Sequence, residues 1–240
     1  MAKKALAQEL KQVREDILHI GTLVEDALRD ALVVLQNCDE RKVKSIIEND
    51  MVIDRLRLAL ETRVMRLFSL YRPIVGQDLH LLVASFTITR ALERSGDGAV
   101  SIAKNTLQLP FEEGKPHVYS QLPLDEKGYV SEFSIIQGLL QLGIEVQRIL
   151  SETMKAFVQG DVVAARYIIE EDDVVDVRYH MVRHDLMSNL KGMRALVAVR
   201  QDEKMLQRAT YLLWMAHKLE RISDHCTTVC EQIIFVYDGK

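Results

Sequence analysis

Glycine and proline are scarce in this 240-residue chain, which contains 11 glycines and 4 prolines. Together they reach only about half of the usual share of these two residues. β-Sandwiches and β-barrels need many turns rich in glycine and proline, so the scarcity argues against both folds. Leucine, alanine, glutamate, arginine and methionine, which favour helices, dominate instead. The composition therefore predicts an all-α protein.

The sequence also lacks an excess of one charge, a long apolar run and paired cysteine motifs. Its 31 basic and 35 acidic residues give a net charge of -4, which argues against a nucleic-acid partner. No apolar run reaches the roughly 18 residues of a membrane span, and the N-terminal sequence becomes charged at once, unlike a signal peptide. Cys38, Cys226 and Cys230 have no CxxC spacing, which suits a reducing compartment and gives no thiolate zinc site. Cys226 and Cys230 lie four apart on one helical face, which predicts core packing for these two. We expect a soluble, cytoplasmic protein.

The chain contains the same unit twice. Residues 39–54 (DERKVKSIIENDMVID) match residues 161–176 (DVVAARYIIEEDDVVD) at 7 of 16 positions, with an offset of 122. The same offset aligns Gly21 with Gly143. Later, LERSGD, which begins at Leu92, recurs as LERISD with an offset of 127. These matches indicate a duplication, with five extra residues between the second and third helices of the second copy.

Proline and glycine gather between the two copies, in residues 110–129, and predict a linker on the surface. The linker separates a first repeat, residues 1–109, from a second repeat, residues 130–240. Asp39 and Asp161 stand where helix N-caps are expected. Apolar residues recur every three or four positions, and long helices joined by short loops form antiparallel bundles. We therefore expect two tandem three-helix bundles related by pseudo-twofold symmetry in an elongated molecule, with helices over residues 3–36, 40–69, 77–107, 131–158, 162–190 and 202–237.

Pairs of acidic residues four positions apart recur at matching places in the two repeats. Side chains four apart share one face of a helix, and these pairs lie within apolar stripes. The pairs lie on the second and third helices of each repeat. If these two helices face each other, their four carboxylates converge. Carboxylates in such a group raise one another's pKa unless a cation lies among them. The residues are Asp50, Asp54, Glu93 and Asp97 in the first repeat, and Asp172, Asp176, Glu220 and Asp224 in the second.

Two interpretations of these acids stay open. Carboxylate oxygens suit Mg²⁺, Ca²⁺, Mn²⁺ or iron, and a group of four can bridge more than one ion. Alternatively, basic side chains close in sequence satisfy the acids as ion pairs on a solvated face. The candidates for these pairs are Arg55, Arg57, Arg90, Arg94, Arg178, Lys218 and Arg221.

Other chemical motifs are missing. No histidine follows a glutamate by three positions, as ferritin-like di-iron sites require. His180 is in line with the second acidic pair, but its counterpart in the first repeat is Leu58, so we interpret it as a helix-surface residue. The glycines of Gly96-Asp97-Gly98 predict a close approach of two helices. No Walker loop, HExxH or GxSxG occurs, so catalysis has no support beyond the acids.

Both repeats resemble the PhoU family, the bacterial accessory and regulatory proteins of phosphate-specific transport. That family carries an acid-xxx-Asp pair on each of two helices per repeat, and the similarity covers essentially the whole chain. Three residues depart from the family pattern, His80, Gly98 and Arg72, and they leave the acidic positions intact. The matching segments are ENDMVIDRL (48–56), LERSGDGAVSIAK (92–104), EEDDVVDVR (170–178) and LERISDHCTTVCE (219–231).

The resemblance implies a cytoplasmic, non-catalytic regulator that represses the phosphate-starvation response. It implies contacts with the ATPase subunit of the phosphate ABC transporter and with a membrane sensor histidine kinase, and a homodimer. It also implies a multinuclear iron or zinc cluster at each acidic group, where chemistry alone leaves Mg, Mn or Ca open. A carboxylate-bridged metalloenzyme and a structural helical protein whose acids form only ion pairs are the alternatives. The implied ligands are Asp50, Asp54, Glu93 and Asp97 for one cluster, and Asp172, Asp176, Glu220 and Asp224 for the other.

Overall fold

The computed structural model describes residues 2–109, 132–194 and 202–239, which form six α-helices and no strand. Each predicted helix is present, and its ends lie within four residues of the predicted ones. The all-α prediction is confirmed. The predicted linker, residues 110–129, lies outside the described residues. The helices are α1 (Ala2–Asn37), α2 (Glu40–Leu70), α3 (Gln77–Leu107), α4 (Glu132–Gln159), α5 (Val162–Arg194) and α6 (Asp202–Asp238).

The two repeats use the same device to reverse the chain after their first helix. Asp39 caps α2, because its carboxylate accepts hydrogen bonds from the backbone amides of residues 41 and 42. Asp161 caps α5 in the same way, with the Ala164 amide 2.9 Å from its Oδ1. The residue just before each cap has a left-handed backbone, with φ of 53° at Cys38 and 65° at its counterpart Gly160. Both predicted N-caps are confirmed.

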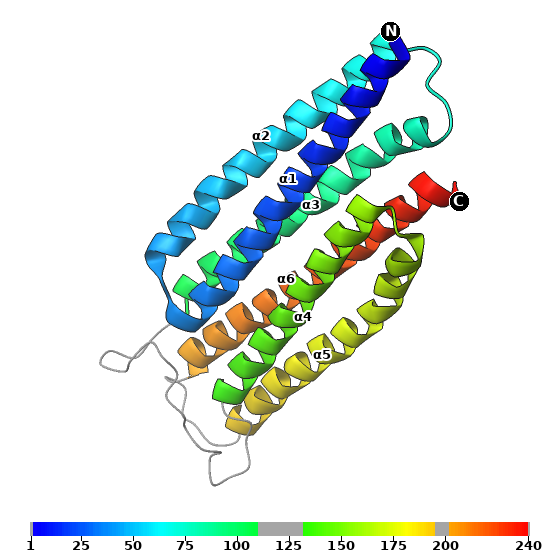
Figure 1. The fold of residues 1–240 in the computed structure, drawn as a ribbon. Coiled ribbons are helices and arrows are strands. Elements are labelled where there is room, and N and C mark those ends of the chain that lie inside the picture. Colours follow the sequence, from blue (N-terminus) through cyan, green and yellow to red (C-terminus); the bar gives the residue numbers. More distant parts are fainter. Residues whose placement is uncertain (1, 110–131, 195–201, 240) are drawn as a thin grey trace.

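The six helices form two three-helix bundles that lie side by side (Figure 1). Helix α3 packs against α6, and α1 packs against α4, so these four helices form the contact between the repeats. Among the described elements, α2 contacts only α1 and α3, and α5 contacts only α4 and α6. Helices α2 and α5 therefore lie at opposite outer edges of the molecule (Figure 1).

Two matching glycines allow the repeats to approach each other. A Cβ on Gly21 in α1 would collide with the end of the Met154 side chain in α4. A Cβ on Gly143 in α4 would collide with the end of the Leu32 side chain in α1. Gly143 and Met154 are the repeat counterparts of Gly21 and Leu32, so the same contact is made twice, as a pseudo-twofold relation requires.

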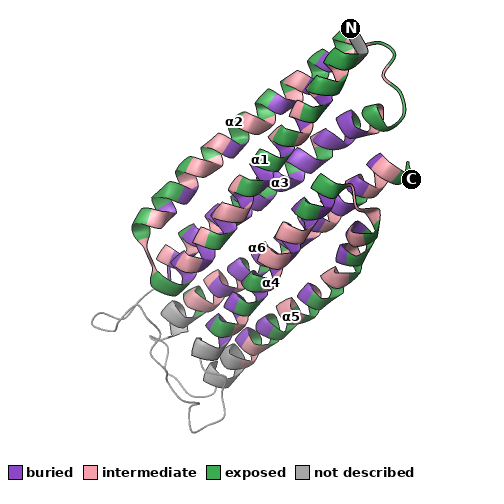
Figure 2. Ribbon diagram, in the orientation of Figure 1, coloured by how far each residue is buried: buried purple, intermediate pink, exposed green. Residues whose placement is uncertain are grey.

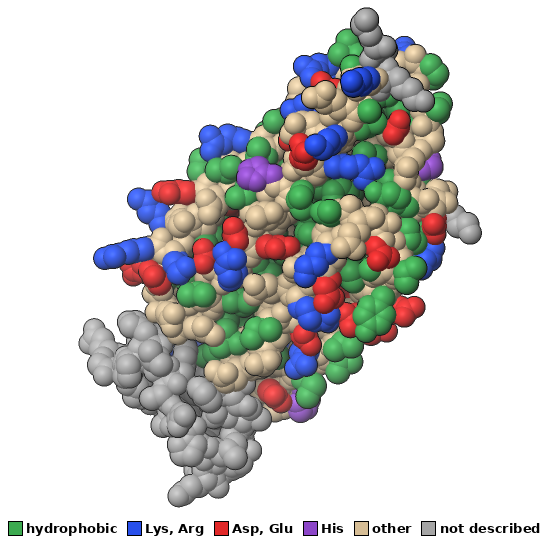
Figure 3. All heavy atoms as spheres, viewed as in Figure 1, with side chains coloured by type: hydrophobic (Ala, Val, Ile, Leu, Met, Phe, Trp, Pro, Cys, Tyr) green, Lys and Arg blue, Asp and Glu red, His purple; other side chains and the backbone are tan. Residues whose placement is uncertain are grey.

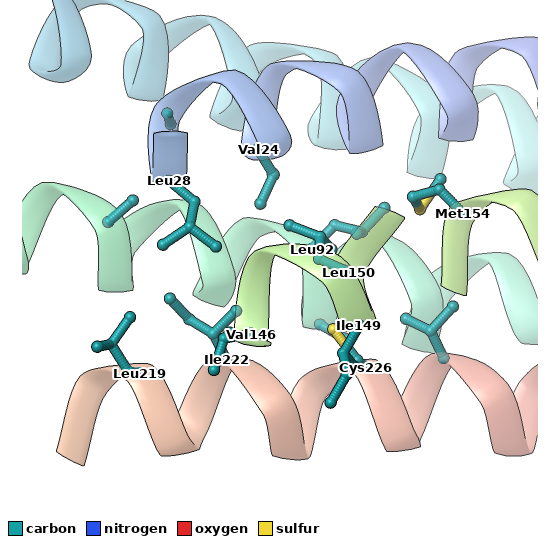
Figure 4. Packing of buried hydrophobic residues seen from close by; sticks show 14 of the residues in the cluster. Val24, Leu28, Leu92, Val146, Ile149, Leu150, Met154, Leu219, Ile222 and Cys226 are labelled. Atoms are coloured by element: carbon teal, nitrogen blue, oxygen red, sulfur yellow. The ribbon is translucent and has the colours of Figure 1, made fainter. Parts of the chain in front are cut away.

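The hydrophobic core runs without a break through both bundles. Buried residues occupy the faces that the helices turn toward one another (Figure 2). At the centre, Leu92 of α3 lies among buried side chains of α1, α4 and α6 (Figure 4). The side chains labelled there are all less than 7% exposed. Cys226 and Cys230 are 1% and 0% exposed, which confirms their prediction as core residues.

On the face drawn in Figure 3, acidic and basic side chains are interspersed, and neither gathers into a broad field of one sign. Within the described ranges, no helix combines the length and the apolar character that crossing a membrane requires.

Candidate functional site

The four acids of the first repeat come together between α2 and α3, as the sequence predicts. Asp50 of α2 lies over Gly96 of α3, where a Cβ would stand 3.3 Å from the Asp50 Oδ1. Burial, followed by repulsion from Asp97, Asp54 and Glu93, raises the pKa of Asp50 to about 6. The predicted close approach at Gly96 is therefore confirmed, and its consequence is a group of mutually repelling carboxylates.

One arginine lies at the edge of this first acidic group. The Arg57 Nε is 3.7 Å from the Glu93 Oε1, and the Arg57 Nη1 is 2.8 Å from Glu61. Burial raises the pKa of Glu93, and Asp97 and Asp54 add to the rise, while Arg57 opposes it. Only one of the four acids therefore has a cation within ion-pair distance among the described residues.

The second acidic group lies between α5 and α6 and is organised differently. The Ser223 hydroxyl donates a 2.5 Å hydrogen bond to the Asp172 carboxylate. Ser223 is the repeat counterpart of Gly96, so the second group has a hydroxyl where the first has no side chain. Burial raises the pKa of Asp172, the nearby Asp224 and Asp176 raise it further, and the Ser223 hydrogen bond opposes the shift.

Glu220 in this group has a buried oxygen atom without a hydrogen bond. The His217 Nδ1 is 3.0 Å from the Glu220 Oε2, but the contact falls outside hydrogen-bond geometry and leaves this oxygen unsatisfied. Tyr179 stands where the first repeat has Arg57, and its ring centroid is 6.3 Å from that of His217. An unsatisfied buried oxygen is uncommon in native proteins and marks this position as one that a ligand can complete.

The ion-pair interpretation explains only part of the two groups. Arg57, His217 and Arg221 contact acids of the groups, the last at 3.9 Å from Asp224. Other nearby arginines point elsewhere, since Arg55 donates to the Met51 carbonyl and Arg178 approaches Glu145. Within the described ranges no ion pair involves Asp50, Asp54, Asp97, Asp172 or Asp176.

His180 is exposed, as predicted for a helix-surface residue.

The chemistry of the acids fits a metal better than their present geometry does. Carboxylate oxygens are the donors that hard divalent cations prefer. Across the described residues, which include all eight acids, no group of three or more His, Cys, Asp or Glu is arranged to hold a metal ion. The acids are therefore gathered but not preassembled, and a shared ion would require side-chain rotation, for which the exposed Asp54 and Asp97 have room.

His225 lies in the contact between α3 and α6 and is neutral at pH 7. The Ser95 hydroxyl donates to the Ala91 carbonyl at 2.9 Å, so the 3.2 Å contact with His225 is donated by the imidazole Nδ1–H. The His225 Nε2 is then a buried acceptor, and it has no hydrogen-bond partner. Burial and three neighbouring cations lower the pKa of His225 to about 4, and these cations are Arg221, Arg94 and Lys218.

Comparison with known proteins identifies the family. The family model of the PhoU domain matches the chain twice, over residues 17–106 and 139–233, which together exceed half of its length. This chain belongs to the PhoU family. The two matched stretches contain both acidic groups, one PhoU domain for each group.

Similar proteins align with almost the whole chain. The phosphate-specific transport system accessory protein PhoU homolog of Clostridium acetobutylicum is 27% identical over 100% of this chain and 97% of its own length. The homolog of Aquifex aeolicus is 29% identical over 98% of this chain and 94% of its own length. The crystal structure of PhoU from Pseudomonas aeruginosa shares the fold, with a TM-score of 0.79, 24% identity and coverage of 98% of this chain and 99% of that one.

Membership of the PhoU family settles one of the sequence predictions. PhoU proteins are accessory regulatory proteins and not enzymes, so the prediction that this chain is not an enzyme is confirmed, and the metalloenzyme alternative loses its basis. The sequence reasoning missed Ser223 and His217. Aligning the repeats at the offset of 127 places Ser223 on Gly96 and would have shown the difference, whereas the His217 contact depends on side-chain positions.

Replacing Asp50 by asparagine is expected to stabilise the metal-free protein at neutral pH. The folded-state pKa of about 6 lies above the ordinary aspartate value of 3.8. The stability that protonated Asp50 contributes is therefore present below about pH 4 and is lost as pH rises through 6. Because Asp50 is partly exposed, we expect a gain of only about 1 kcal/mol at pH 7.5. Urea unfolding at pH 4.5 and 7.5 measures this difference, with Asp26→Asn as the matched control. An equal effect at both pH values would contradict the prediction.

Proposed function

We propose that this protein is a cytoplasmic regulator of phosphate uptake that represses the phosphate-starvation response when phosphate is plentiful. The observation that carries the proposal is the duplicated PhoU domain, together with full-length relatives named as accessory proteins of phosphate-specific transport. The protein would act through protein contacts, as an adaptor between the ATPase subunit of the phosphate ABC transporter and a sensor histidine kinase. We retain residues 1–109 and 130–240 as its two repeats.

Deletion and co-purification test this function together. Deleting the gene in the native host should switch on phosphate-starvation genes in phosphate-rich medium, and a plasmid copy should restore repression. The tagged full-length chain should also co-purify with the transporter ATPase or the sensor kinase. Unchanged expression after deletion, together with the absence of both partners, would refute the adaptor function.

We propose further that each acidic group binds a metal cluster, with Asp50, Asp54, Glu93 and Asp97 at one site and Asp172, Asp176, Glu220 and Asp224 at the other. The raised pKa of Asp50 and the unsatisfied Glu220 Oε2 support this proposal. A bound iron or zinc cluster, or Mg, Mn or Ca in its place, would supply positive charge. Helix α2 packs against α3, and α5 packs against α6, so one cluster would reach carboxylates of both helices of a pair.

Metal content is expected to fall by half when either acidic group is disabled. The variants are Asp54→Ala/Asp97→Ala and Asp176→Ala/Asp224→Ala, and combining all four substitutions should remove the metal. Elemental analysis of protein purified without chelator measures the change. Asp26→Ala/Asp30→Ala is the matched control, because this pair is also four apart on a helix but its acids form ion pairs with Arg29 and Lys42. Wild-type protein without metal, or equal loss in the control, would refute the metal sites.

We also propose that the chain forms a homodimer through the outer face of α5. Exposed apolar side chains recur three, four or seven positions apart on this face, which is the spacing of a helix–helix seam. In an antiparallel pair of α5 helices centred between Val174 and Val177, Val174 of one protomer would meet Val177 of its partner, and the reverse contact would form as well. The seam residues are Val163, Tyr167, Val174, Val177 and Met181, which are between 51% and 78% exposed.

Val174→Glu/Val177→Glu is expected to convert a dimer into a monomer, because it places like charges at the centre of the seam. Light scattering after size-exclusion chromatography measures the mass, which is 27.5 kDa for one chain. The matched control is Leu58→Glu/Met65→Glu on α2, where equally exposed apolar residues occupy the corresponding helix of the first repeat. A monomeric wild type, or dissociation in the control alone, would refute the α5 dimer.

A further inference from the structure

A small cavity lies at the contact between the two repeats and shares Asp97 with the first acidic group. It has a volume of about 250 Å³ and is open to solvent. One wall belongs to α3 and the other to α6. Its size is below the roughly 300–1,000 Å³ of pockets for drug-sized ligands, so it suits a small ion. The lining residues are Arg94, Asp97, Gly98, His217, Lys218, Arg221, Ile222 and His225.

One position of the cavity lining differs between the two repeats. Gly98 of α3 is the counterpart of His225 of α6, and a Cβ on Gly98 would lie 3.1 Å from the Ile222 Cδ1. The missing side chain lets α6 approach α3, while the imidazole of His225 contributes to the opposite wall.

The cavity is electropositive at neutral pH. Three of its side chains, Arg94, Lys218 and Arg221, carry a positive charge, against the single carboxylate of Asp97. Arg221 reaches Asp224 only at 3.9 Å, and in the described part of the chain no carboxylate lies within ion-pair distance of Arg94 or Lys218. Charged donors in a concave site attract anions, and arginine and lysine bind the oxygens of phosphate in particular.

The lining also contains an acceptor that favours an anion carrying a proton. The Asp97 carboxylate lacks a hydrogen-bond donor among the described residues. Monohydrogen phosphate has a hydroxyl that donates to such an acceptor, and its other oxygens accept from the cations. Sulfate carries no proton at neutral pH, so its oxygens would only repel the Asp97 carboxylate.

We propose that this cavity binds the phosphate group of inorganic phosphate or of a small phosphate ester. Arg94, Lys218 and Arg221 donate hydrogen bonds to its oxygens. The Asp97 carboxylate accepts a hydrogen bond from its hydroxyl group. The bound anion joins α3 to α6 and thereby links the two PhoU domains across their contact. The site rests on its lining and not on the proposed function, so phosphate binding and partner binding can fail separately.

Isothermal titration of chelator-treated protein with inorganic phosphate at pH 7 tests the site. We expect one saturable site per chain, and binding weaker by at least about tenfold in Arg94→Gln/Lys218→Gln, because two charged hydrogen bonds are lost. The matched control is Lys11→Gln/Lys44→Gln, which changes the net charge equally at exposed positions. Sulfate at equal ionic strength should bind at least about tenfold more weakly than phosphate. Circular dichroism verifies the fold of each variant, and Lys218→Glu, which places a carboxylate in the cavity, provides a second test.

The possible results separate the sources of the anion and the rival sites. If inorganic phosphate binds more tightly than glycerol phosphate, the ligand is the free ion. If glycerol phosphate binds more tightly, the ligand is a phosphate ester. Either result supports the cavity as the binding site. Binding that survives both cavity variants, or is lost in the control, would overturn the proposal. Binding that appears only after a divalent metal is added would place the anion at the acidic groups and overturn it as well. An absence of saturable binding to the wild type would also overturn it.

Discussion

Replacing Leu92 by alanine is expected to lower the free energy of unfolding by about 2–5 kcal/mol. Leu92 is 1% exposed and lies on α3 where the two bundles meet, with side chains of α1, α4 and α6 around it (Figure 4). Four helices converge there, so the surrounding side chains have little freedom to collapse into the space that the substitution leaves. The loss should therefore include a cavity term as well as the loss of buried apolar surface.

Urea unfolding followed by circular dichroism measures this loss. Leu58→Ala is the matched control, since Leu58 is 53% exposed on α2 and its substitution should change the stability by less than about 0.5 kcal/mol. Because the core is continuous, Leu92→Ala should leave a single unfolding transition that moves to lower urea concentration. Equal effects of the two substitutions would contradict the burial of Leu92, and two separate transitions would contradict a shared core.

Local sequence signals account for much of the fold. Asp39 and Asp161 mark the starts of α2 and α5 because a carboxylate that caps a helix needs only the next three residues. Helical spacing and the duplication together were sufficient to predict that Asp50 and Asp97 lie in one group. Each of these predictions depends on contacts within one helix or on two helices that must share an apolar face.

The partners of the acids were beyond the reach of the sequence. Several basic residues lie near the acids in the chain, but Arg57 reaches Glu93 while Arg55 turns to its own helix backbone. Which arginine pairs with which acid depends on the rotation of α2 against α3 and on side-chain rotamers, and neither leaves a periodic signal. The cavity beside Gly98 was hidden for the same reason, because it depends on how α3 and α6 of different repeats meet.

The contact between the repeats should show itself as an energetic coupling between Gly21 and Met154. Gly21→Val alone is expected to cost about 1–3 kcal/mol, because its side chain enters the space that Met154 occupies. Met154→Ala alone should cost about 2–5 kcal/mol, because Met154 is 3% exposed. In the double variant, the valine fills the space that the methionine leaves, so the total should be about 1–3 kcal/mol less than the sum of the single effects.

The pseudo-twofold relation supplies the control for this cycle. Gly143 is the repeat counterpart of Gly21, but its Cβ would collide with Leu32 and not with Met154. Gly143→Val should therefore couple with Leu32→Ala by a similar amount and add independently to Met154→Ala. Coupling of both glycines to the same side chain, or of neither to its neighbour, would contradict the arrangement of α1 against α4. Coupling along both matched pairs would mean that each repeat supplies the glycine for the other repeat's side chain, so neither bundle completes this contact alone.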